Sequence, residues 1–139
     1  MDAVDAVDAA VDDGSGSAAG AVDVFARNGV PRATLETVTG RWAPLVLLAL
    51  AERSRRFGVL RQRVQGVSEK MLAQTLRTLE RDGLVERRLS GGVPPRVEYA
   101  LTPMGVAFAQ RLRRLADLCQ ESAGEVAAAR EAYADGLAG

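Results

Sequence analysis

The segment 68–84, SEKMLAQTLRTLERDGL, constrains the fold of this 139-residue chain more than any other. Its apolar positions recur at helical spacing: Leu72, Leu76 and Leu79. Ser68 is suited to cap the start of such a helix, and Gly83 is suited to end it. The opposite side carries polar side chains: Lys70, Gln74 and Arg77. The segment therefore predicts an amphipathic helix with a buried stripe and an exposed polar row.

Two strand-like segments, 85–89 and 97–101, follow this helix. The loop between them, SGGVPPR, has glycines where a positive φ is cheap and prolines where no ladder donor is needed. A shorter helix precedes the helix at 68–84. It has apolar residues at Phe57, Leu60 and Val64, and a glycine-bearing turn at 65–67 follows it. This order predicts a mainly α fold with a small β-hairpin (α+β), namely a winged helix-turn-helix.

Charge is distributed unevenly, although the net charge is zero. Residues 1–23 hold six acids and no base, whereas residues 24–103 hold fourteen bases against seven acids. We expect residues 1–20 to be a disordered acidic tail, and an arm that competes with DNA for the basic region is the alternative. The zero net charge therefore does not argue against a nucleic-acid partner.

Segment 41–52, RWAPLVLLALAE, predicts a buried helix with Pro44 in its first turn. Its expected core residues are Trp42, Leu45, Val46, Leu48, Ala49 and Leu50. Trp42 could also form one wall of a ligand pocket, although packing is the simpler role for an indole.

Thr102 and Pro103 predict the start of a long final helix. Its apolar and small residues follow a heptad rhythm: Phe108, Leu112, Leu115, Cys119, Ser122 and Val126. This rhythm favours pairing with the same helix of a second chain, and packing back onto its own domain is the alternative.

Other functional classes find little support in the composition. The chain has no histidine, one cysteine, no glycine-rich phosphate loop and no metal-ligand cluster, so we expect no enzyme, no cofactor and no metal. No stretch suits a membrane span or a signal peptide, and we therefore expect a cytoplasmic protein.

Duplex DNA is the expected partner. Side chains on helix 68–84 would face the major groove, and the surrounding arginines would attract phosphates. The residues predicted to contact DNA are Arg55, Arg56, Ser68, Lys70, Gln74, Arg77, Arg87, Arg88 and Arg96. A winged helix that binds protein without DNA affinity is the alternative.

The sequence resembles the HxlR family of bacterial winged-helix regulators, also called DUF24. The matching residues are GRW at 40–42, RRFGVL at 55–60, VSEKMLAQTLRTLERDGLVERR at 67–88 and VPPRVEYALTPMG at 93–105. The resemblance implies a dimeric repressor on a palindromic operator. It also implies a DNA-binding domain at 21–103 with an N-terminal dimerisation helix, and a C-terminal dimerisation helix at 104–139. The expected dimer residues are Phe25, Leu112, Leu115, Cys119 and Val126.

One departure from the family concerns its sensor cysteine, which in many members lies about thirteen residues before the tryptophan. Here that region contains Asn28, Gly29, Val30 and Pro31. We therefore expect no thiol switch, and we expect Cys119 to be a small apolar residue in the helix seam. A small-molecule effector is the alternative means of release, with Trp42, Phe108 and Leu112 as the expected pocket residues.

Overall fold

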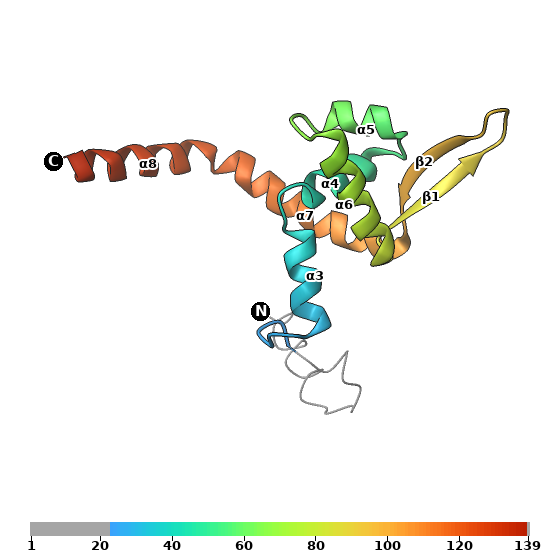
Figure 1. Cartoon of the computed structure of the whole chain (residues 1–139). Coiled ribbons are helices and arrows are strands. Elements are labelled where there is room, and N and C mark those ends of the chain that lie inside the picture. The colour runs from blue at the N-terminus through green and yellow to red at the C-terminus, as the bar shows by residue number, and fades with distance from the viewer. Residues whose placement is uncertain (1–22, 139) are drawn as a thin grey trace.

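The computed structural model describes residues 23–138 and contains six helices and one hairpin (Figure 1). The acidic tail 1–20 lies outside the described residues. In chain order the elements are α3 (Val30–Val38), α4 (Ala43–Glu52), α5 (Phe57–Arg63), α6 (Glu69–Arg81), β1 (Val85–Ser90), β2 (Arg96–Leu101), α7 (Pro103–Glu121) and α8 (Ala123–Ala138). None of the helices described is long and apolar enough to cross a membrane.

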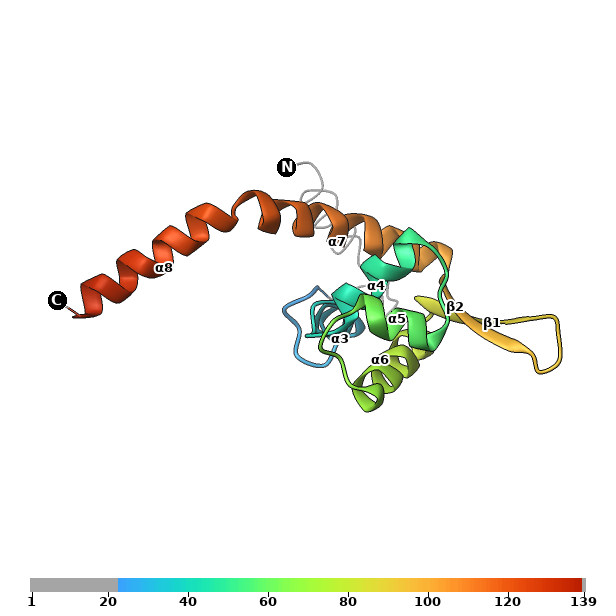
Figure 2. The same cartoon turned by 90° about the horizontal axis from the view of Figure 1, so that it is seen from above.

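Helix α4 lies at the centre of the domain, between α6 on one side and α7 on the other (Figure 2). It is apolar nearly all round, and Val46 and Leu47 are fully buried. The prediction that Leu45 is a core residue was wrong, because its side chain is 45% exposed while Leu47 takes the core position. Trp42 and Leu48 are partly buried and pack against the core.

Helices α5 and α6 form the helix-turn-helix, with Gly66 in the turn at a φ of 92°. Leu60 of α5 is fully buried. On α6 the predicted stripe is buried: Leu72, Leu76 and Leu79. Gly83, at a φ of 80°, directs the chain away from α6 into β1, a conformation that costs glycine little.

Strands β1 and β2 form an antiparallel hairpin, the wing, with Val85 paired to Leu101 and Ser90 paired to Arg96. An isolated bridge joins Tyr99 of β2 to Arg55, so the connection between α4 and α5 lies along the second strand. The loop end of the wing projects away from the helices (Figures 1 and 2). The winged helix-turn-helix predicted from the sequence is confirmed.

Helix α7 packs along α4, and Ala109 and Leu112 belong to the common core. The expectation that Leu112 lies in a dimer seam was therefore wrong, because the residue is 8% exposed within its own domain. The single long helix is also interrupted at Ser122, where α7 ends. Helix α8 continues beyond the domain and buries none of its residues in the chain (Figure 1).

Candidate nucleic-acid interface

Helix α6 presents its polar row to solvent, opposite its buried leucines. The hydroxyl oxygen of Ser68 accepts a hydrogen bond of 3.1 Å from the backbone amide of Met71, as expected for an N-cap. Lys70, Gln74 and Arg77 are all exposed. They lie one turn apart along the helix, so three hydrogen-bonding side chains point to one side of the molecule.

Arg87 extends this polar surface onto the wing. Its guanidinium lies 3.4 Å from the carboxylate of Glu80, on the flank of α6 that faces β1. Both side chains are substantially exposed, so the ion pair contributes little to stability. Arg87 is therefore available beside α6, where it can exchange Glu80 for another anion at a small cost in free energy.

Arg88 is placed differently from its neighbour. Successive side chains of a strand point to opposite faces, and Arg88 accordingly lies on the face of the hairpin away from Arg87. Its guanidinium donates a 2.7 Å hydrogen bond to Glu86, and its cross-strand partner is Glu98. The predicted DNA contact of Arg88 stays a prediction, and the structure places this side chain on the other face of the wing from Arg87.

Arg55 has a structural role, and its predicted contact with phosphate was wrong. The side chain is only 6% exposed, and its Nε donates a 3.0 Å hydrogen bond to the carbonyl of Ala49. One of its terminal nitrogens, Nη2, pairs with Glu52. A guanidinium held in this way cannot reach a duplex.

Glu52 joins Arg55 to Arg63. Its carboxylate accepts hydrogen bonds of 2.9 and 2.7 Å from Arg63. These hydrogen bonds, together with the charges of Arg63 and Arg55, lower the pKa of Glu52 from 4.5 to about 2. The network ties the end of α4 to α5 and so fixes the first helix of the helix-turn-helix.

Arg56 and Arg96 lie together at the wing. Both are exposed, and both line a hollow of about 630 Å³ formed with the loop between the strands. Their juxtaposition creates a second basic area beside the α6 row, at a position where a winged helix can reach the DNA backbone.

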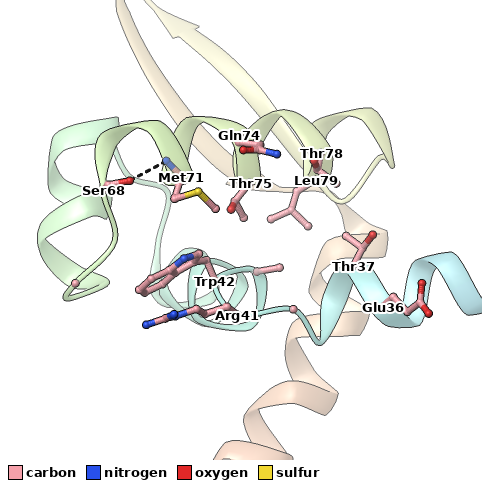
Figure 3. A pocket seen from close by; sticks show the side chains of 13 residues that line it. Glu36, Thr37, Arg41, Trp42, Ser68, Met71, Gln74, Thr75, Thr78 and Leu79 are labelled. Atoms are coloured by element: carbon pink, nitrogen blue, oxygen red, sulfur yellow. Dashed lines mark hydrogen bonds between the residues drawn. The ribbon is translucent and has the colours of Figure 1, made fainter.

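A hollow of about 550 Å³ separates α6 from Trp42 (Figure 3). The indole lies under the first turns of α6, near Met71, and the guanidinium of Arg41 lies 5.0 Å from its ring centre. The hydroxyl-bearing lining residues are Thr37, Ser68, Thr75 and Thr78. Gln74 lines the hollow as well as belonging to the exposed row of α6.

Phe108 and Leu112 do not line the hollow that contains Trp42, so the pocket predicted from the three residues stays a prediction. Trp42 lines the hollow beside α6, whereas Leu112 is buried in the core and Phe108 packs against that core. Helical periodicity indicated that all three residues are apolar and inward-facing, but it carried no information on which of them meet. The threonines of α6 lie beside its leucine stripe. This position was the sequence feature that could have predicted that they line the hollow.

The comparisons with known proteins agree with this geometry. The model of the HxlR-like helix-turn-helix family matches residues 37–126, from the end of α3 into α8. This chain belongs to that family. The match includes both helices of the helix-turn-helix and the whole wing.

Proteins that are similar to this chain are named as transcriptional regulators. The HTH-type transcriptional regulator YtfH of Escherichia coli (strain K12) is 45% identical over 109 residues, which cover 78% of this chain and 86% of YtfH. The solved structure of the regulator ytfH from Salmonella typhimurium is 44% identical, with a TM-score of 0.72, covering 78% of this chain and 97% of that one.

A redox regulator has a related structure. HypR in its reduced form is 27% identical, with a TM-score of 0.64, and the match covers 70% of this chain and 96% of HypR. Together, the family and these relatives identify the chain as a helix-turn-helix transcriptional regulator with the winged-helix fold.

Proposed function

We propose that the chain binds operator DNA as a homodimeric repressor, with one α6 helix of each protomer in the major groove. One observation carries this proposal. The exposed row of α6 and Arg87 of the wing form one continuous polar surface, joined through the Glu80 ion pair. As a regulator of the chromosome, the protein would act in the cytoplasm.

Each side chain of the row has a chemical role in this proposal. Lys70 and Arg77 can donate hydrogen bonds to the guanine acceptors in the major groove, and Gln74 can pair with adenine. The hydroxyl group of Ser68 can donate a hydrogen bond to a phosphate, because in the cap its oxygen acts only as an acceptor. Arg56, Arg87 and Arg96 would supply the attraction that does not depend on sequence.

Exposed apolar side chains support the dimer. Leu115 is 52% exposed and Leu118 is 56% exposed on α7, and Val126 continues the exposed apolar positions into α8. Phe25, before α3, is 86% exposed. A second copy of the chain would cover this surface and set the two α6 helices one helical turn of DNA apart. Cys119 is exposed in the single chain, so its expected burial in a seam depends on this partner.

A small molecule that releases the protein from DNA would bind in the hollow between α6 and Trp42 rather than in the pocket expected from the sequence. A ligand in the hollow would contact Gln74, which the proposal also assigns to base reading. It would therefore compete with DNA for the same side chain. Trp42 is the only tryptophan in the chain, so its fluorescence reports directly on occupancy.

A gel-shift titration against the intergenic DNA beside the gene tests the proposal. A shift that weakens with salt supports it. A protein-binding winged helix is the alternative, and it predicts no shift at any salt concentration, because such a module needs no exposed cationic row for phosphates.

A further inference from the structure

A second hollow, of about 900 Å³, lies between α4, β2 and α7. We call it the rear groove, since α6 lies on the other side of α4 from α7 (Figure 2). Its lining includes the buried apolar residues Leu50, Ala100 and Ala109 and the partly exposed Val106. Arginines from the wing and α7 also line it: Arg88, Arg111, Arg113 and Arg114.

The rear groove has an excess of positive charge. Glu52 is the one acid among its lining residues, and its carboxylate is already engaged by Arg55 and Arg63. Arg113 pairs with Asp117 at 3.0 Å, whereas Arg114 has no ion-pair partner among residues 23–138. The DNA interface uses none of these α7 arginines. An apolar interior with cations around it suits an anionic occupant that also carries apolar side chains.

The chain itself contains a segment with this chemistry. Residues 2–13, DAVDAVDAAVDD, hold five aspartates and no base. Their valines recur at helical spacing, at Val4, Val7 and Val11, so a helix over this segment would present one apolar side and one acidic side. We propose that residues 2–13 dock in the rear groove, with the valines on its apolar interior and the aspartates toward its arginines.

Tethering favours this occupant over a free molecule. The nine residues 14–22 connect the segment to the described part of the chain and can extend over about 30 Å. Where a short linker of this kind can span the distance to the groove, it gives an effective concentration on the order of millimolar, so a weak interaction suffices. Because the rear groove lies away from α6, the docked segment would leave the α6 row free.

Paramagnetic relaxation in the full-length chain tests this docking. A nitroxide is attached to Ala6→Cys in a Cys119→Ser background, which leaves a single thiol. At about 0.1 M salt, the amide signals of Ala51, Ala109 and Gln110 should lose intensity. The signals should recover at about 1 M salt, where the Debye length falls to about 3 Å.

Matched charge reversals locate the contact. Arg114→Glu alters an exposed side chain of the rear groove and should restore the attenuated signals. Arg77→Glu reverses an exposed charge on α6 and should leave the attenuation unchanged. Attenuation centred on Lys70–Arg77 would overturn the proposal in favour of an arm over the DNA interface. Uniformly unattenuated spectra would overturn it in favour of a solvated tail.

Discussion

The guanidinium of Arg87 lies 3.4 Å from the carboxylate of Glu80, and this ion pair links the wing to α6. Arg88, the next residue, hydrogen-bonds Glu86 on the other face of the hairpin. Two adjacent arginines of equal charge are thus assigned to different surfaces. A phosphate beside α6 can replace Glu80 as the partner of Arg87 at small cost, because exposed ion pairs are weak.

Alanine substitutions should distinguish the roles of Arg87 and Arg88 in DNA binding. Arg87→Ala should weaken DNA binding and reduce the salt slope of log K by about 2 for a dimer, about 1 for each lost phosphate contact. Arg88→Ala, the matched control, should leave both quantities close to those of the unmodified protein. Fluorescence anisotropy across a salt series measures them. Equal losses for both variants would contradict the assignment of Arg88 to the rear groove.

Glu52 should stabilise the fold in a pH-dependent way. Glu52→Gln removes the carboxylate that Arg55 and Arg63 share, and Arg55 is buried, so the free energy of unfolding should fall by about 1–2 kcal/mol at neutral pH. Urea denaturation measures this loss. Glu121→Gln, at an exposed position on α7, is the control and should cost less than about 0.5 kcal/mol.

The sign of the pH dependence follows from the lowered pKa. The pKa of Glu52 is about 2 in the folded chain against 4.5 for the unperturbed carboxyl, so the folded state binds fewer protons between these values. The stabilisation is therefore complete above about pH 5 and is lost as the pH falls toward 2. The difference between wild type and Glu52→Gln should shrink over that window. A difference that grows on acidification would contradict the assigned network.

Gly105 should not tolerate a side chain. A Cβ at this position in α7 would overlap the carbonyl oxygen of Leu84, at the start of the wing. Gly105→Ala should therefore destabilise the domain by about 3 kcal/mol, because the overlap involves backbone that cannot move alone. Gly124→Ala is the control, since its Cβ would meet open space and alanine favours the helix. Thermal unfolding of the two variants measures the contrast, and equal stability would contradict the packing of α7 against Leu84.

Leu115→Glu should dissociate the proposed dimer. The substitution places a charge on the exposed apolar surface of α7 without disturbing the core. Sedimentation velocity should show a dimer for the unmodified chain and a monomer for the variant. Val59→Glu, at a similarly exposed position on α5, should remain dimeric. A monomeric unmodified chain would rule out the dimer.

The sequence predicted the DNA-binding elements well because their signals are local. The leucine spacing and Ser68 defined α6, and the glycines and prolines of the loop between the strands defined the wing. Successive side chains alternate between the two faces of a strand, which places Arg87 and Arg88 on opposite faces of the wing.

Other features depend on tertiary packing rather than on local periodicity. Arg55 is buried because its backbone bridges Tyr99 and its guanidinium meets Glu52 and Ala49. None of these pairings has a periodic signature. The heptad rhythm of α7 was ambiguous for a related reason, since a stripe that packs on a neighbouring α4 has nearly the same spacing as a dimer seam.

Binding of the full-length chain to the DNA upstream of its own or the neighbouring gene, measured across a salt series, tests the central claim most directly. Three phosphate-contacting arginines per protomer give about six contacts per dimer, hence a slope of log K against log salt of about −5. The affinity should fall about 10³-fold between about 50 and 200 mM salt. No shift at the lowest salt concentration, or binding that salt does not weaken, would contradict the claim that α6 and the wing form a DNA-binding surface.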